Sequence, residues 1–292
     1  MRIVSLIASA TEIVHALGLG PRQVGRSHEC DYPAEVSLLP ICSHPRFIPD
    51  GNSLQIDQAV RALVQAGSVY EIDYPMMERL RPTHIVTQSH CRVCAVSREE
   101  VERTLGAEFP GSPSVVTLEP NCLADVWADI RRIAKACEVE EAGERLVVDL
   151  ERRMEEVRTR VDGLRRPKVV CIEWIEPLMP AGNWMPELVD MAGGVNLFTQ
   201  AGQHTPQLDW GELVAADPDV IVVSPCGFDL ERTEAEMHWM TDRAEWSALQ
   251  AVRNGRVHLI DGNQYMNRPG PRLVETLEIL ADCLHPGPRN YP

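Results

Sequence analysis

The amino-acid sequence predicts an α/β protein with two lobes joined by a long helix. The chain has 292 residues, which is more than a single hydrophobic core usually serves. Short apolar runs alternate with amphipathic helical patterns in both halves, as expected of α/β lobes. A long helical stretch lies between the two sets of strands. We therefore expect an N-terminal lobe over 1–121, a helical spine over 122–166 and a C-terminal lobe over 167–292.

Seven segments are predicted to be strands, and several of them are continuous apolar runs. Such runs are typical of parallel strands that are buried on both faces of a sheet. Each is followed by a loop and a helical pattern, so both lobes are expected to be Rossmann-like. The segments are Arg2–Ile7, Gln23–Arg26, His84–Gln88 and Val115–Leu118 in the first half, and Lys168–Glu173, Val220–Ser224 and Arg256–Ile260 in the second.

The central helical stretch consists of one helix over Leu123–Ala136 and a longer one over Glu140–Leu164. The longer helix carries one apolar stripe on a period near 3.6 residues, while its other face is highly charged. The stripe is formed by Leu146, Leu150, Met154, Val157, Val161 and Leu164. A helix of this length between two α/β lobes is expected to act as a rigid spine. The alternative is an ordinary surface helix of the first lobe.

Composition and charge exclude several classes of protein. Apolar residues make up 44% of the chain, which is ordinary for a globular protein and argues against disorder. The formal net charge of -15 should repel a phosphate backbone, so nucleic acid is not an expected partner. No apolar run is long enough to span a membrane.

The N-terminal segment and the cysteines bear on location. Arg2–Ile7 is predicted to be a first strand rather than an export signal, so a cytoplasmic location is expected, with the periplasm as the alternative. The nine cysteines are an odd number in a large chain, which favours reduced thiols over a disulfide framework.

Unusual polar and aromatic residues follow the predicted strands, at the points where the strands end. Ligands of open parallel sheets bind beyond the carboxyl ends of the strands, and loops there carry function. If the lobes face each other, these loops line one cleft. The aromatic candidates, which suit the walls of a flat ligand, are Trp174, Trp184, Phe228 and Tyr265. The polar candidates are His28, Glu29, Gln88, Glu173, Arg268 and Arg272.

Six short motifs stand out in the loops that follow the predicted strands. They are His28-Glu29-Cys30-Asp31-Tyr32-Pro33, Cys91-x-x-Cys94, Glu173-Trp174, Gly182-x-Trp184-x-Pro186-Glu187, Pro225-Cys226-Gly227-Phe228 and Arg268-Pro269-Gly270-Pro271-Arg272. These motifs resemble those of the cobalamin- and siderophore-type binding proteins, in particular a branch without signal peptides that is described as cobalamin-binding-like. The resemblance covers essentially the whole chain. The fold it implies is that of class III substrate-binding proteins, in which a rigid helix joins two α/β lobes.

The resemblance implies a binding protein that grips cobalamin, a related corrinoid or tetrapyrrole, or another metal chelate between its lobes. A monomer is expected, and an ABC permease is an expected partner. In exported relatives an acidic patch on each lobe docks on basic residues of the permease. Glu12 and Glu187 occupy equivalent positions in the two halves. Their alternative role is structural, because acidic residues favour the first turns of helices.

A second hypothesis is a cytoplasmic enzyme or cofactor-handling protein that uses a metal or thiols in the same cleft. The sequence favours binding over catalysis but leaves this alternative open. Cys91 and Cys94 form a single C-x-x-C motif, to which His28, Cys30 and Cys226 could add ligands for a transition metal. Glu173 completes the Cys/His/Glu set on which this hypothesis rests. The C-x-x-C pair could instead be redox active, since the helix expected to begin near Ser97 would lower a thiol pKa. Buried, inert cysteines are the remaining interpretation.

Overall fold

The computed structural model describes residues 1–48, 50–89, 96–106 and 109–287. The chain forms two compact units. Unit 1 comprises Met1–Gly51, Gln55–Pro120 and Ala124–Val148, and unit 2 comprises Asn52–Leu54, Asn121–Leu123 and Asp149–Pro292. Two short segments that are distant in sequence, 52–54 and 121–123, therefore belong to the C-terminal unit.

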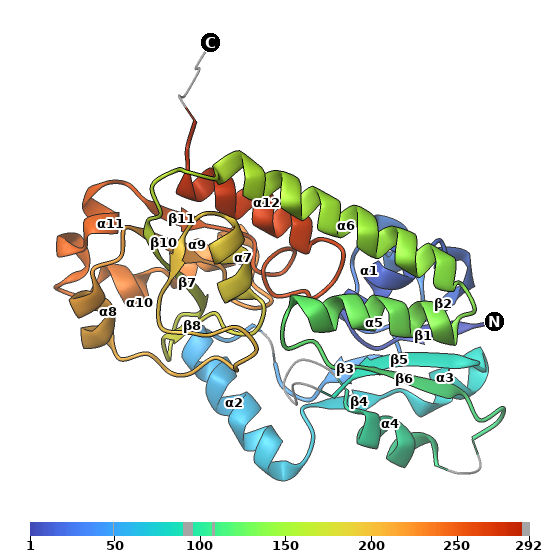
Figure 1. Ribbon diagram of the computed structural model, residues 1–292. Helices are drawn as coiled ribbons and strands as arrows, with labels where there is room; N and C mark the ends of the chain where they lie inside the picture. Colours follow the sequence, from blue (N-terminus) through green and yellow to red (C-terminus); the bar gives the residue numbers. More distant parts are fainter. Residues whose placement is uncertain (49, 90–95, 107–108, 288–292) are drawn as a thin grey trace. The chain divides into compact units, whose positions relative to one another are not determined.

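A four-stranded parallel sheet forms the centre of unit 1 (Figure 1). The strand order is β2-β1-β5-β6, with all neighbours parallel. The strands span Ile3–Ser5 (β1), Gln23–Arg26 (β2), His84–Gln88 (β5) and Ser114–Leu118 (β6). All four strands predicted for this half are confirmed. Continuous apolar runs indicate strands that are buried on both faces of a sheet. Strand β5 is an example, since its neighbouring residues Ile85 and Val86 are both fully buried.

The remaining elements of unit 1 surround this sheet. A two-stranded antiparallel ribbon, β3 (Ser43–Pro45) with β4 (Tyr70–Ile72), was not predicted. The 3-10 helices η1 and η2 span Gly20–Arg22 and Ala34–Leu38. The α-helices are α1 (Ala8–Ala16), α2 (Ser53–Ala66), α3 (Tyr74–Leu80), α4 (Arg98–Leu105) and α5 (Leu123–Ala136), of which α2 and α5 begin with residues of unit 2.

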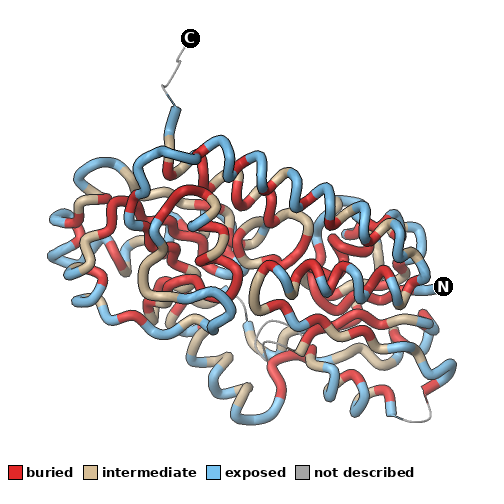
Figure 2. The backbone as a smooth tube through the Cα atoms, viewed as in Figure 1, coloured by how far each residue is buried: buried red, intermediate tan, exposed pale blue. Residues whose placement is uncertain are grey.

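Unit 2 contains a second, mainly parallel sheet of five strands. Its order is β11-β10-β7-β8, and β9 also pairs with β7. Within this sheet β8 runs antiparallel to its neighbour, and the other pairs are parallel. The strands span Lys168–Trp174 (β7), Met179–Pro180 (β8), Val195–Asn196 (β9), Val220–Val223 (β10) and Val257–Leu259 (β11). The three predicted strands, β7, β10 and β11, form its centre, and β10 is buried along its whole length (Figure 2).

Short helices connect the strands of unit 2. One face of the sheet packs on a core that includes Val170, Ile172, Ile221 and Val223. The helices are α7 (Met185–Met191), α8 (Trp210–Ala216), α9 (Leu230–Glu236), α10 (His238–Thr241), η3 (Trp246–Ala248), α11 (Gln250–Arg253) and α12 (Leu273–Leu284).

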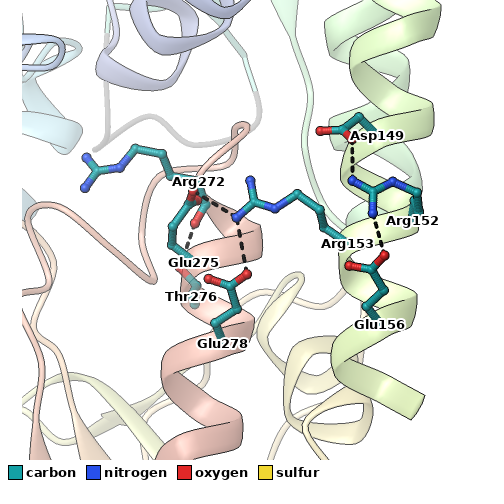
Figure 3. Close-up of polar contacts among 8 residues, drawn as sticks. All are labelled: Asp149, Arg152, Arg153, Glu156, Arg272, Glu275, Thr276 and Glu278. Carbon is teal, nitrogen blue, oxygen red and sulfur yellow. Dashed lines mark hydrogen bonds and ion pairs between the residues drawn. The ribbon is translucent and has the colours of Figure 1, made fainter. Parts of the chain in front are cut away.

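The long helix α6 spans Glu140–Val161, and its residues divide between the units after Val148. It ends before Leu164, the last residue of the apolar stripe that predicted it. Gly163 adopts a φ of 74°, a left-handed conformation that commonly follows a helix, and Leu164 is consequently 48% exposed. The stripe is buried from Leu150 to Val161. Within unit 2, Arg153 of α6 binds Glu275 at 3.4 Å and Glu278 at 3.2 Å, both on α12 (Figure 3).

None of the helices in the described part of the chain combines the length and the apolar character needed to cross a membrane.

Candidate ligand-binding site

Glu173 lies at the carboxyl end of β7, where a loop from later in the chain crosses it. The Thr205 hydroxyl donates a hydrogen bond of 2.6 Å to Glu173 Oε1 and accepts one of 3.2 Å from the Gly182 backbone N–H. A side chain at Gly182 would collide with the Gln203 carbonyl, since a Cβ there would lie 2.5 Å from it. Burial raises the pKa of the Glu173 carboxyl, although the hydrogen bonds from Thr205 and Gly182 oppose this.

Trp174, the last residue of β7, forms an aromatic pair with Phe228. Their ring centroids are 5.2 Å apart and the planes are tilted by 57°, within the range of favourable aromatic contacts. The Arg232 guanidinium lies 3.9 Å from the centroid of the Phe228 ring, as in a cation–π contact. Phe228 is almost fully buried, whereas Trp174 remains partly exposed. The structure thus brings together two aromatic residues that are distant in the sequence, and Trp174 keeps surface for a ligand.

The other predicted aromatic and basic residues of unit 2 lie around the segment before α12. The Trp184 indole donates a 2.8 Å hydrogen bond to the Met266 carbonyl, and Trp184 is buried. The Arg272 guanidinium lies 4.6 Å from the centroid of the Tyr265 ring. Arg268 is buried and binds Asn263 Oδ1 at 3.0 Å. These contacts fix side chains of the same segment against each other.

His28 and Glu29 lie beyond the carboxyl end of β2 in unit 1. His28 Nε2 is 3.6 Å from Glu29 Oε1, and the imidazole lies 5.4 Å from the Tyr70 ring. Burial lowers the pKa of His28 to about 4; a hydrogen bond with the Ser43 backbone opposes the shift, while the nearby His44 and Arg26 add to it. At neutral pH, His28 is therefore an uncharged donor and acceptor. Gln88, the last residue of β5, is buried.

The predicted metal or thiol cluster is only partly within the described residues, because Cys91 and Cys94 lie outside them. Cys30 is buried, and its sulfur accepts a 3.0 Å hydrogen bond from the Thr11 hydroxyl. Burial raises the pKa of the Cys30 thiol, which disfavours the thiolate that metal binding needs. Cys226 is exposed in unit 2. In the described ranges no three His, Cys, Asp or Glu side chains are grouped as a metal site would require.

Glu187 has a contact that the repeat pattern did not predict. Its carboxylate accepts a 2.8 Å hydrogen bond from the backbone N–H of Leu123, the first residue of α5. Glu12 is buried in α1. The carboxylate of Glu187 thus has a structural role in its own unit, at a helix start where negative charge is favoured.

Two groups of contacts, one at Glu173 and one at Trp174, could not be found from the sequence. Thr205 belongs to a polar loop without a motif, far along the chain from the Glu173 that it contacts. Ser53 and Glu236 meet across 183 positions. The only sequence signal for them is a serine at a helix start and a glutamate in a charged helix, and both are common on surfaces.

Comparisons with known proteins agree with this architecture. A family model described as periplasmic binding protein matches residues 3–263. The vitamin B12-binding protein of Vibrio cholerae is 23% identical over 287 residues, which cover 97% of this chain and 88% of the relative. An uncharacterised ABC transporter substrate-binding lipoprotein of Bacillus subtilis is 24% identical over 292 residues, covering 98% of this chain and 80% of the relative.

Solved structures show the same fold. The periplasmic vitamin B12 binding protein of Vibrio cholerae has a TM-score of 0.69 at 23% identity, with 97% of this chain and 96% of that chain covered. The periplasmic heme-binding protein of Roseiflexus sp. RS-1, in its apo form, has a TM-score of 0.70 at 22% identity, with 97% of each chain covered. With most of its length matched by the family model and its two α/β units in place, the chain belongs to the periplasmic binding protein family.

Proposed function

We propose that this protein binds a corrinoid or a related tetrapyrrole that carries a metal, and that loops at the carboxyl ends of its sheets hold the ligand. The observation that carries the proposal is the Trp174–Phe228 aromatic pair at the carboxyl end of β7, in a chain of the periplasmic binding protein family. The names of two relatives point the same way, since one binds vitamin B12 and another binds heme.

The chemistry of the pair suits such a ligand. A partly exposed indole backed by a buried phenyl ring offers a flat apolar surface at little cost in conformational entropy. Glu173, the preceding residue of β7, has a carboxyl whose pKa is raised by burial and which offers a hydrogen-bonding group for an amide or hydroxyl of a ligand.

We also propose that the protein serves an ABC permease and acts in the periplasm or at the cell surface. The Bacillus subtilis relative is named as an ABC transporter substrate-binding lipoprotein, and other relatives are named as periplasmic. The cytoplasmic location expected from the N-terminal segment is not supported by these relatives, which favour the periplasmic alternative.

The test is a titration of the purified chain with cyanocobalamin, haemin and a ferric siderophore, followed by visible spectroscopy and thermal unfolding. We expect one tetrapyrrole to show a spectral shift, and to raise Tm by an amount that grows with ligand concentration. Trp174→Leu should weaken binding by about tenfold or more. Trp210→Leu is the matched control, because Trp210 is also a partly exposed indole of unit 2 but packs on Trp246 instead. Absence of binding by both cyanocobalamin and haemin, whether or not the siderophore binds, or equal losses in the two variants, contradicts the proposal.

A further inference from the structure

Ser53, the first residue of α2, is held by side chains of unit 2, to which residues 52–54 belong. Its backbone N–H donates to Glu236 Oε2 at 3.1 Å, and its hydroxyl donates to the same oxygen at 2.7 Å. Its carbonyl oxygen accepts a 3.3 Å hydrogen bond from the Trp174 indole N–H, which is also 3.1 Å from the Glu176 carbonyl. Ser53 is fully buried and Glu236 is 7% exposed, so water competes little for these bonds.

Glu236 and Arg232 lie on one face of α9, because they are four residues apart. Arg232 covers the Phe228 ring, and Phe228 packs on Trp174. Glu236 reaches Ser53, whose carbonyl binds Trp174. The Trp174 ring thus contacts Phe228, and its N–H edge is held by the carbonyls of Ser53 and Glu176. Helix α9 supports Phe228 through Arg232 and Ser53 through Glu236.

The N-terminus of α2 is a favourable place for the buried carboxylate of Glu236. The first N–H groups of a helix have no partner within it, and the helix dipole favours negative charge there. Glu236 meets one such N–H and a hydroxyl with a single oxygen. Hydrogen bonds to a charged group are stronger than neutral ones, so the carboxylate holds Ser53 more firmly than an amide would.

We propose that Glu236 is a positioning residue for ligand binding. It fixes Ser53, and the Ser53 carbonyl in turn sets the plane of the Trp174 indole that meets the ligand. This inference rests on the proposed function in that it takes Trp174 to be part of the binding surface. Glu236 acts on the indole through Ser53 and, in this proposal, does not touch the ligand.

The first experiment compares Glu236→Gln with Glu234→Gln, an exposed glutamate on the same helix. The Glu236→Gln variant keeps the shape of the side chain and loses its charge. We expect its Kd for the tetrapyrrole identified in the titration to rise about five- to tenfold, while the Glu234→Gln variant stays within about twofold of the wild type. Equal affinities for Glu236→Gln and wild type, measured far below Tm, overturn the inference.

A double-mutant cycle with Trp174→Phe separates positioning from a general structural role. Phenylalanine keeps an aromatic ring but lacks the N–H that binds Ser53, so in this background Glu236→Gln should change Kd by less than about twofold. An undiminished effect of Glu236→Gln in the Trp174→Phe background overturns the inference, because the effect would then not pass through the indole.

A ligand-free measurement keeps this inference apart from the proposed function. The chain has six tryptophans, so labelling with 5-fluorotryptophan gives a small set of ¹⁹F signals, and Trp174→Phe assigns the one of interest. Glu236→Gln should shift or broaden that signal, and Glu234→Gln should leave it in place. If the signal responds but no tetrapyrrole binds the wild type, the proposed function fails and the positioning of Trp174 by Glu236 stands. An unchanged signal refutes the positioning role whatever the ligand.

Discussion

The stability of the protein should depend on pH through His28, and the size of the effect follows from its burial. The imidazole has an ordinary pKa of 6.5 in the unfolded chain, whereas burial lowers the folded pKa to about 4. Between these values the unfolded chain takes up a proton that folded His28 does not. The free energy of unfolding therefore falls as pH falls from 6.5 towards 4. At about 1.4 kcal/mol per pH unit, the loss reaches about 2 kcal/mol at pH 5 and about 3 kcal/mol at pH 4.

The assay compares urea unfolding of the wild type and His28→Gln between about pH 7.5 and 4.5, followed by circular dichroism. Glutamine does not titrate, so the wild type should lose about 2 kcal/mol more than the variant by pH 5. His238→Gln, which replaces an exposed histidine of unit 2, is the control and should follow the wild-type curve. An NMR titration of the His28 ring should show no midpoint above about pH 5. Parallel stability curves for wild type and His28→Gln, or a ring midpoint near the ordinary value, would refute the reasoning.

Two further predictions concern unit 2. The raised pKa of Glu173 means that its ionisation lowers the free energy of unfolding as pH rises, whereas glutamine does not ionise. The free energy of unfolding of Glu173→Gln, relative to the wild type, should therefore be higher at pH 8 than at pH 5. Urea unfolding at both pH values measures it, and the same relative value at both contradicts the prediction. Arg153→Met should lower the free energy of unfolding by at most about 1 kcal/mol, and less in about 1 M NaCl, since its two ion pairs are partly exposed. The control is Arg152→Met, which removes ion pairs only within α6. A loss of several kcal/mol that does not depend on salt in the Arg153→Met variant would contradict the prediction.

The central strands and the two main helices could be predicted from the sequence because each obeys a local rule. Strand β10 is a run of four apolar residues that is buried along its whole length, and α5 begins and ends where its pattern does. Strands β3, β4, β8 and β9 have only two or three residues each and, unlike the equally short β1 and β11, they do not stand within a longer β-rich run. Their pairing depends on what the rest of the fold places beside them, and β3 and β8 even contain proline.

The candidate site was predictable in part, for the same reason. Trp174 and Phe228 stand at or just after the ends of buried strands, and the ends of parallel strands are where ligand-binding residues gather. The partners that fix their geometry come from loops and helix ends with no motif. Thr205 and Ser53 contact the site only because of how distant segments pack, and the sequence shows no periodicity or spacing that would reveal this.

Helices α2 and α5 share a feature that has a consequence during synthesis. The first residue of each is bound at its backbone N–H by a glutamate of unit 2, Ser53 by Glu236 and Leu123 by Glu187. A ribosome adds about 5–20 residues per second, so Ser53 waits roughly 10–40 s for a carboxylate that is encoded 183 positions later. Leu123 waits only about 3–13 s, because Glu187 is encoded 64 positions later. The start of α2 therefore lacks its carboxylate partner for longer than the start of α5, and it gives chaperones and proteases the wider window.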